Sequence, residues 1–312
     1  MTGEAEAERI EEINGEEVDH REFEEDRIIM ELQETFKAVH PSIVALGSRF
    51  VMAPANDPPS FPWIIGTGFI VDSRGIVATN KHVAEELLNL PHDPETNAPA
   101  AFALVYSCIR DDEEYTTINL NFVEIRYIAL PNSFTPPAGG YFGEPIPDLA
   151  FMQLEVTDVP ALSLVKSPNS LLVGMSVATA GFPLGTPPLT PYGYVSQVTP
   201  FLRKGIVSSV QPFPCAFPHG FTLDIMLQGG SSGSPVFMEN SPEVVGIVHG
   251  HCENGPNITF ALPSKVIAEG LSTCLETMPF DFSDLPTLQS LVNQPGLADK
   301  LDFQRRLPVL RW

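Results

Sequence analysis

Short apolar runs separated by turn residues fill the chain from residue 43 to residue 261. Most runs are too short for a typical helix, and proline and glycine, 31 and 23 residues in all, recur between them. This pattern predicts about a dozen strands in two groups, joined by a crossover at residues 157–169, and so a pair of barrels or one sandwich. The first group comprises residues 43–50, 64–71, 75–79, 102–108, 116–129 and 149–154, and the second comprises residues 176–180, 194–198, 205–210, 221–227, 235–238, 244–249 and 258–261.

Helical periodicity is confined to the ends of the chain. It predicts helices at residues 265–275 and 284–302, and an amphipathic helix within residues 22–39 that ends before Pro41. A helix as short as the first is marginal in water, so we expect its apolar stripe to pack on the barrels or on a neighbouring subunit, either to regulate the protein or for stability alone. The stripe comprises Phe23, Ile28, Leu32 and Phe36.

The formal net charge is −22, and half of it lies in residues 1–35, which hold 14 acidic and 3 basic side chains. Phosphate contacts need lysine and arginine, so this balance argues against nucleic acid and against anionic membranes as partners. No apolar run reaches the roughly 18 residues of a spanning helix, and the first residues lack the basic and apolar regions of a signal peptide. We therefore expect a cytoplasmic protein.

Three segments carry residues with catalytic chemistry. His82 ends a predicted strand–turn–strand unit at residues 66–82, Asp148 directly precedes the predicted strand at 149–154, and residues 229–237 read Gly-Gly-Ser-Ser-Gly-Ser-Pro-Val-Phe. A serine hydroxyl is a poor nucleophile until a base takes its proton, and an imidazole does this near neutral pH. A carboxylate fixes the imidazole tautomer and stabilises the imidazolium.

These segments resemble, in the same order along the chain, the His, Asp and Ser motifs of the chymotrypsin-fold serine peptidases, and most closely those of the HtrA/DegP-type protease domain. Three further segments resemble that branch: Val-Gly-Met-Ser-Val-Ala-Thr-Ala-Gly-Phe-Pro-Leu-Gly at 173–185, Gly-Ile-Val-Ser at 205–208 and Ile-Thr-Phe-Ala-Leu-Pro-Ser at 258–264. Each motif is weak alone, but together they extend the similarity over residues 41–275.

The resemblance implies an all-β fold of two six-stranded antiparallel β-barrels with short N- and C-terminal helices. It divides the chain into an acidic tail and helix at 1–40, an N-terminal barrel at 41–160, a C-terminal barrel at 161–275 and a helical extension at 276–312. The last segment is too short for the PDZ domain that many HtrA-type proteins carry.

For function, the resemblance implies a serine endopeptidase that hydrolyses peptide bonds in proteins through an acyl-enzyme intermediate. His82, Asp148 and Ser232 would form its triad, and the N–H groups of Gly230 and Ser232 its oxyanion hole. It implies protein or peptide substrates and no cofactor or metal, and it leaves a homo-oligomer or a regulatory protein partner open. The alternative is a catalytically silent binding scaffold with the same fold.

Neighbouring residues compete with two members of this triad. Register favours Ser232 over Ser231 and Ser234, because it has glycine two residues before, glycine one after and proline three after. Ser234 stands where the family usually has a second glycine, and we expect its small side chain to fit. Asp148 is favoured by the apolar strand that follows it. Its rivals are Asp111, Asp112 and Asp158.

The resemblance places a substrate-binding strand at residues 244–252. By alternation, Val248 faces the primary specificity pocket and His249 the other side. The uncharged segment at 225–229 supplies another wall, so an apolar pocket follows, with recognition of an acidic or amide group by a histidine as the alternative. The predicted substrate-binding residues are Met226, Leu227, Val248, His249 and Gly250.

The four cysteines show no paired short spacing, which predicts reduced thiols. Two of them, with nearby histidines, allow zinc as an alternative, although their spacing matches no standard motif. The residues concerned are Cys215, His219, His249, His251 and Cys252.

Overall fold

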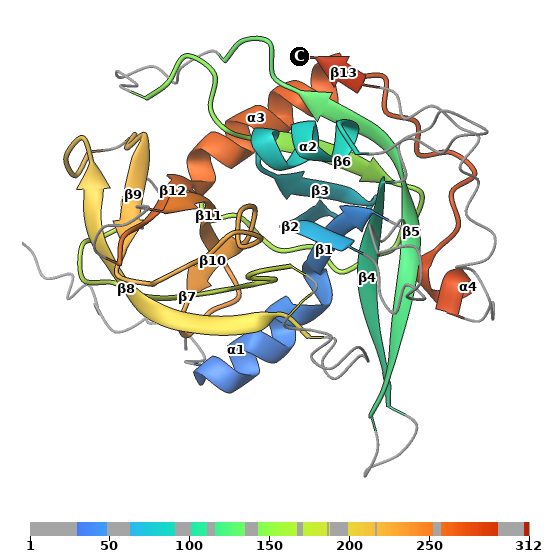
Figure 1. The fold of residues 1–312 in the computed structure, drawn as a ribbon, viewed down its shortest axis with the longest axis horizontal. Coiled ribbons are helices and arrows are strands. Elements are labelled where there is room, and N and C mark those ends of the chain that lie inside the picture. Colours follow the sequence, from blue (N-terminus) through green and yellow to red (C-terminus); the bar gives the residue numbers. More distant parts are fainter. Residues whose placement is uncertain are drawn as a thin grey trace, which may run out of the picture.

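The N-terminal half of the molecule forms a β-barrel, which lies on the right in Figure 1. The computed structural model describes residues 30–48, 63–90, 101–110, 116–134, 143–166, 171–185, 187, 199–215, 217–251, 257–292 and 309–311. Neighbouring barrel strands pair antiparallel in the order β5-β4-β1-β2-β3-β6, and β5 also pairs with β6, which closes the barrel. The strands are β1 (Ile43–Ser48), β2 (Trp63–Asp72), β3 (Ile76–Thr79), β4 (Ala101–Arg110), β5 (Thr116–Leu130) and β6 (Ala150–Leu154).

A second closed barrel of six antiparallel strands follows along the chain, in the order β10-β11-β12-β9-β8-β7. Its strands are β7 (Ser176–Gly181), β8 (Phe201–Gln211), β9 (Gly220–Leu223), β10 (Pro235–Met238), β11 (Val244–His251) and β12 (Thr259–Pro263). The predicted fold class of two six-stranded antiparallel barrels is therefore confirmed. Each strand predicted within the described residues is present, and the one at 194–198 lies outside them.

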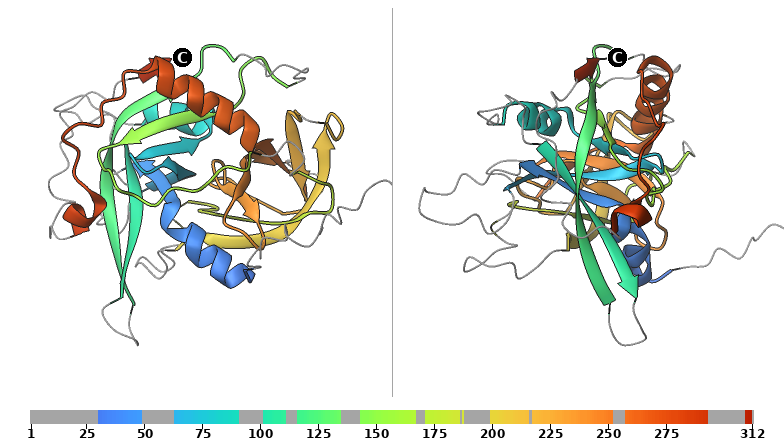
Figure 2. Two further views of the ribbon diagram at one scale, coloured as in Figure 1. Left: turned by 180° about the vertical axis from the view of Figure 1, so that it is seen from behind. Right: turned by 90° about the vertical axis from the view of Figure 1, so that its right-hand side faces the viewer.

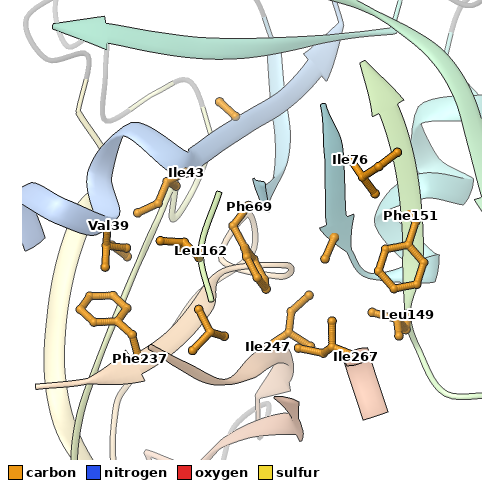
Figure 3. Close-up of a cluster of buried hydrophobic side chains, with 14 of the residues drawn as sticks. Val39, Ile43, Phe69, Ile76, Leu149, Phe151, Leu162, Phe237, Ile247 and Ile267 are labelled. Carbon is orange, nitrogen blue, oxygen red and sulfur yellow. The ribbon is translucent and has the colours of Figure 1, made fainter. Parts of the chain in front are cut away.

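A shared apolar cluster joins the two barrels. Ile43 and Phe69 from the N-terminal barrel meet Phe237 and Ile247 from the C-terminal barrel in one buried group (Figure 3). Each barrel also has its own interior cluster. Burying one large apolar side chain stabilises the fold by roughly 1.5–3 kcal/mol. Because the shared cluster buries several of them, it holds the two barrels rigidly together. A catalytic site built from both barrels would therefore be held at fixed geometry.

Two helices pack across this contact. Helix α1 (Leu32–Val39), followed by a 3₁₀ turn at His40–Ser42, leads into β1, and its Leu32 and Phe36 pack against the shared cluster. The predicted stripe thus lies on the barrels in its described part, while Phe23 and Ile28 lie outside the described residues. Helix α3 (Ser264–Thr277) runs along both barrels, at the top of the left view in Figure 2 with α1 at the bottom, and buries Ile267 in the cluster. The predicted helix at 265–275 is therefore present.

The segment after α3 differs from the predicted helical extension at 276–312. Its described part contains one short helix, α4 (Leu288–Val292), and a strand, β13 (Val309–Arg311), that pairs parallel with β5. The pairing of β4 with β5 ends at Glu124, so the later part of β5 presents an unpaired edge. An unpaired strand edge readily accepts another strand, and β5 accepts β13 at residues 128–130. Among the described helices, none is both long and apolar enough to span a membrane.

Candidate active site

His82 lies at the start of a helix rather than at a strand end. Strand β3 stops at Thr79, and helix α2 (Lys81–Leu88), which the sequence reasoning did not predict, begins two residues later. Buried Asn80 lies between them, and its Nδ2 donates to the Asp148 carbonyl at 2.9 Å. This side chain ties the turn that carries His82 to the segment that carries Asp148.

The His82 and Asp148 side chains are in direct contact. The distance from His82 Nδ1 to Asp148 Oδ2 is 2.7 Å, and the backbone N–H of His82 donates to Oδ1 of the same carboxylate at 3.0 Å. Both carboxylate oxygens are therefore engaged by one residue. The contact orients the ring and assigns the Nδ1 proton to the shared bond, which leaves Nε2 unprotonated in the neutral imidazole.

The contact raises the pKa of His82 and lowers that of Asp148. The hydrogen bond from Asp148 raises the pKa of His82, against the effect of burial, and the nearby charges of Asp148, Glu86 and Glu85 add to the rise. Burial acts to raise the pKa of Asp148, but the hydrogen bonds and charge of His82 outweigh it and hold that pKa below its ordinary value. A base next to a carboxylate whose pKa is lowered is the arrangement that general base catalysis needs.

Ser232 lies in a tight loop just before β10. Gly230 and Gly233 on either side of it both have φ of +87°, a conformation that favours glycine. A Cβ at Gly230 would lie 2.3 Å from the Phe182 carbonyl oxygen, and one at Gly233 would lie 1.9 Å from that of Thr67. The two glycines are therefore required by the close approach of other backbone as well as by their own φ angles.

Among the three serines of this loop, Ser232 alone is partly exposed. Ser231 and Ser234 are 2% and 1% exposed, and neither hydroxyl has a hydrogen-bond partner within the described residues. An incoming substrate can reach only a hydroxyl at the surface. The exposure pattern thus supports the predicted register.

Two backbone N–H groups in the loop are unused. Within the described part of the chain, neither the N–H of Gly230 nor that of Ser232 donates to a protein acceptor. The Gly229 carbonyl, which shares a peptide with the Gly230 N–H, accepts a hydrogen bond from the Leu184 N–H at 2.5 Å. In a trans peptide the N–H points opposite to the carbonyl, so this bond turns the Gly230 N–H away from Leu184. Both donors of the predicted oxyanion hole are thereby available.

The link between Ser232 and His82 is not closed in this geometry. No hydrogen bond joins the Ser232 hydroxyl to the His82 ring within the described residues. Such bonds are often long in ligand-free proteins and tighten when substrate binds. The loop is nonetheless tied to the barrel that carries His82, because the Thr67 N–H donates to the Ser232 carbonyl at 2.9 Å.

A cavity of about 700 Å³ lies beside the His82–Asp148 pair. Its walls come from both barrels, as expected of a cleft at their junction. The lining includes His82, Asp148, Glu144, His219, His249 and Phe260.

Two of the predicted substrate-binding residues, Val248 and His249, lie on different faces of β11. Val248 is buried in the interior of the C-terminal barrel together with Leu227, whereas His249 lines the cavity on the Asp148 side. The register of β11 against β12 shifts between Val248 and Gly250, and a bulge of this kind redirects a side chain. Met226 is 56% exposed, and the space around Gly250 is open. Burial lowers the pKa of His249, so its ring is neutral near neutral pH.

The candidate zinc residues that the structure describes do not assemble into a metal site. No group of three or more His, Cys, Asp or Glu side chains arranged to hold a metal ion occurs among the described residues, and Cys252 lies outside them. Cys215 and Cys274 are free thiols, and burial raises the pKa of Cys274 to about 12.

Sequence reasoning missed Thr67, Asn80 and Leu184, which hold the loops around the site. Thr67 and Leu184 each stood inside a motif that carried the resemblance, yet nothing in one sequence shows that Thr67 meets Gly230, 163 positions away, or that Leu184 meets Gly229. A conserved pattern at these positions would be the signal to look for.

Two antiparallel six-stranded barrels, with a His–Asp pair on one and a serine loop on the other, define the chymotrypsin fold. The sequence profile of the trypsin-like peptidase domain matches residues 66–247, more than half of the chain. The protein therefore belongs to the trypsin-like peptidase family.

A solved structure supports the fold. The HtrA-type protease AlgW with a decapeptide is 18% identical over 80% of this chain and 68% of its own, with a TM-score of 0.50. The serine endoprotease from Yersinia pestis is 16% identical over the same shares, with a TM-score of 0.47. Comparison with curated protein sequences gives no match.

Proposed function

We propose that this protein is a serine endopeptidase in which Ser232 is the nucleophile, His82 the general base and Asp148 the residue that orients and stabilises the base. The observation that carries the proposal is the 2.7 Å contact between His82 Nδ1 and Asp148 Oδ2, combined with one exposed serine beside two unused N–H donors. A site with all of these parts matches the requirements of acyl transfer.

The proposed reaction begins when Ser232 Oγ attacks the carbonyl carbon of the scissile peptide. The hydroxyl proton passes to His82 Nε2, and ionised Asp148 stabilises the imidazolium. The carbonyl oxygen becomes an oxyanion and accepts hydrogen bonds from the N–H groups of Gly230 and Ser232. Removing one such donor typically lowers the rate by about 10²- to 10³-fold, so the two free N–H groups are a major part of the proposal.

The remaining steps use the same groups. His82 returns the proton to the leaving nitrogen as the C–N bond breaks, which leaves an acyl ester on Ser232. Water then attacks the ester while His82 takes one of its protons. Collapse of this second intermediate releases the acid product, and the proton goes back to Ser232 Oγ. No external reactant besides water is consumed.

Substrates are proposed to be proteins or peptides whose residue before the cleaved bond is apolar. The uncharged segment at 225–229, in which Met226 is 56% exposed, supports this preference, whereas Leu227 and Val248 pack in the interior of the C-terminal barrel and do not add to it. The neutral His249 ring borders the neighbouring cavity and is proposed to contact residues further along the substrate. Assembly into homo-oligomers, a regulatory partner and a cytoplasmic location stay predictions from the sequence.

A fluorophosphonate probe tests the nucleophile, because it reacts covalently with an activated serine. Tandem mass spectrometry of the labelled protein should place the adduct on Ser232, and Ser232→Ala should abolish labelling. Ser231→Ala, which removes a buried neighbouring hydroxyl, should still label. An adduct on Ser231 or Ser234 would refute the register, and no labelling of the wild type would favour the silent scaffold.

A further inference from the structure

Thr67 of β2 forms four hydrogen bonds with residues outside its strand, and two of them reach the serine loop. Its side chain is fully buried. The hydroxyl donates to the Gly230 carbonyl at 2.8 Å and accepts the Phe182 N–H at 3.1 Å. The backbone N–H of Thr67 donates to the Ser232 carbonyl at 2.9 Å, and its carbonyl accepts the Thr79 hydroxyl at 2.7 Å. A residue of one barrel therefore contacts the proposed nucleophile loop of the other at two points.

The hydroxyl of Thr67 supports the two peptides that meet at Gly230, one directly and one through the segment at Phe182. On one side it fixes the carbonyl of Gly230 directly. On the other it fixes Phe182, two residues before Leu184, whose N–H binds the Gly229 carbonyl. Gly230 has no Cβ to limit its rotation, so its conformation depends on these two carbonyl contacts. The direction of the Gly230 N–H is set by them.

The same residue relates the loop to the proposed base. Thr79, which binds the Thr67 carbonyl, is one residue before Asn80 and three before His82. Asn80 in turn holds the backbone of Asp148. A continuous hydrogen-bonded path thus runs from the Ser232 carbonyl through Thr67 to the segment that carries the His–Asp pair.

The chemistry of the position is restrictive. One buried atom must donate a proton to a carbonyl and accept an N–H, which a hydroxyl does and a methyl group does not. Valine has the shape of threonine but would remove both hydrogen bonds, the one to the part-buried Gly230 carbonyl and the one from the Phe182 N–H. An unsatisfied buried polar group is costly, so the loop is expected to rearrange and expose these groups to water.

We propose that Thr67 is a positioning residue whose hydroxyl holds the Gly230 peptide in the orientation that the oxyanion hole requires. This inference rests on the proposed peptidase function. It assigns to the N-terminal barrel a part in stabilising the transition state, beyond supplying the base. Thr67 itself does not touch the substrate.

Steady-state kinetics with a peptide substrate test the proposal. Thr67→Val should lower kcat by about 10- to 100-fold with KM changed less than about twofold, since the lost interaction acts in the transition state. Thr67→Ser, which keeps the hydroxyl, should retain at least about a third of kcat. Thr179→Val is the matched control, because Thr179 is equally buried and its hydroxyl has no partner within the described residues. It should behave as the wild type.

Hydrogen–deuterium exchange gives a second readout that does not depend on turnover. Amides of residues 228–234 should exchange faster in Thr67→Val than in the wild type or in Thr67→Ser, at temperatures far below unfolding. If the wild type has no peptidase activity, the proposed function fails, and exchange alone still decides whether Thr67 positions the loop. Should Thr67→Val not fold, Thr67→Cys replaces it, because a thiol is a weak donor and acceptor.

Two outcomes would overturn the proposal. One is wild-type kcat in Thr67→Val together with unchanged exchange in residues 228–234. The other is an equal loss of kcat in Thr67→Val and Thr67→Ser, which would show that the hydroxyl is not the group that matters.

Discussion

Gly181 and Ser234 face each other so closely that a Cβ on Gly181 would lie 2.0 Å from Ser234 Oγ. Gly181 is the last residue of β7, and Ser234 follows the proposed nucleophile by two positions. The serine that replaces the family's usual second glycine thus occupies space that the absence of a side chain at Gly181 provides. This pairing is the physical reason why Ser234 fits.

The pairing predicts a specific coupling between mutations. Gly181→Ala should lower stability by about 1–3 kcal/mol through overpacking, and Ser234→Gly should recover part of the loss in the double variant. Thr67 Oγ1, 2.7 Å from the added Cβ, keeps the recovery incomplete. Urea unfolding of the four proteins measures the coupling. Ser231→Ala, at the neighbouring buried serine, should give no recovery, and additive Gly181 and Ser234 effects would contradict the prediction.

The pH dependence of kcat/KM follows from the His82–Asp148 contact. Because Asp148 raises the pKa of His82 above its ordinary value of 6.5, the unprotonated base forms only at higher pH. The profile should therefore rise with pH through one ionisation above 6.5. Asp148→Asn should shift that ionisation downward, since the main cause of the raised pKa is gone, and lower kcat by about 10⁴-fold. A profile that is flat from pH 5 to 8 would rule out His82 as the base.

His249 is predicted to affect selectivity rather than the chemical step. It lines the cavity beside Asp148 but forms no hydrogen bond with the Ser232 loop among the described residues. His249→Ala should change the order of preference in a peptide library and leave fluorophosphonate labelling of Ser232 within about threefold, as expected for lost substrate contacts. His251→Ala, on the same strand but exposed and outside the cavity, is the control. Unchanged selectivity would remove His249 from the binding site.

The first helix is predicted to stabilise the barrels. Phe36 packs on the cluster that joins them, whereas Lys37 is exposed and pairs only with Glu34 among the described residues. Phe36→Ala should lower the free energy of unfolding by about 1–3 kcal/mol, less than for a fully buried phenylalanine. Lys37→Ala should change it by less than about 0.5 kcal/mol, because exposed ion pairs contribute little. Equal effects of the two substitutions would show that the helix does not stabilise the barrels.

Deletions separate stability from regulation in the same region. Removing residues 1–40 takes away Phe36 and should lower Tm, whereas removing residues 1–20 should not. A regulatory acidic segment would show itself as a changed kcat/KM, or a changed salt dependence, in the shorter deletion alone. Unaltered kinetics in both would leave the helix with a structural role only.

The sequence predicted the barrel strands well because each contains a short apolar run, and several, such as β1 and β6, are buried along their whole length. The longer strand β8, of mixed composition, was predicted only in part, at 205–210. It failed where local pattern and tertiary context diverge. Helix α2 was missed because His82 was assigned to a strand end, although Val83, Ala84 and Leu87 share a buried helical face. β13 forms only because β5 offers an open edge, which no local pattern reveals.

The candidate site shows the same division. His82, Asp148 and Ser232 stand in recognisable motifs, so the sequence points to each of them. The sequence does not point to the residues that support them. Thr67 binds Gly230, 163 residues away, and Leu184 binds Gly229 through backbone atoms alone. Contacts of this kind depend on how the two barrels meet, which is a property of the folded chain.

Turnover of an unfolded protein by the wild type and by Ser232→Ala is the most direct test of the proposed function. Mass spectrometry of the products should show new N-termini with the wild type, after apolar residues, and a rate lower by about 10⁴-fold or more with Ser232→Ala at an unchanged Tm. Equal rates for the two proteins, or no new N-termini with the wild type, would contradict the assignment of Ser232 as the nucleophile of a peptidase.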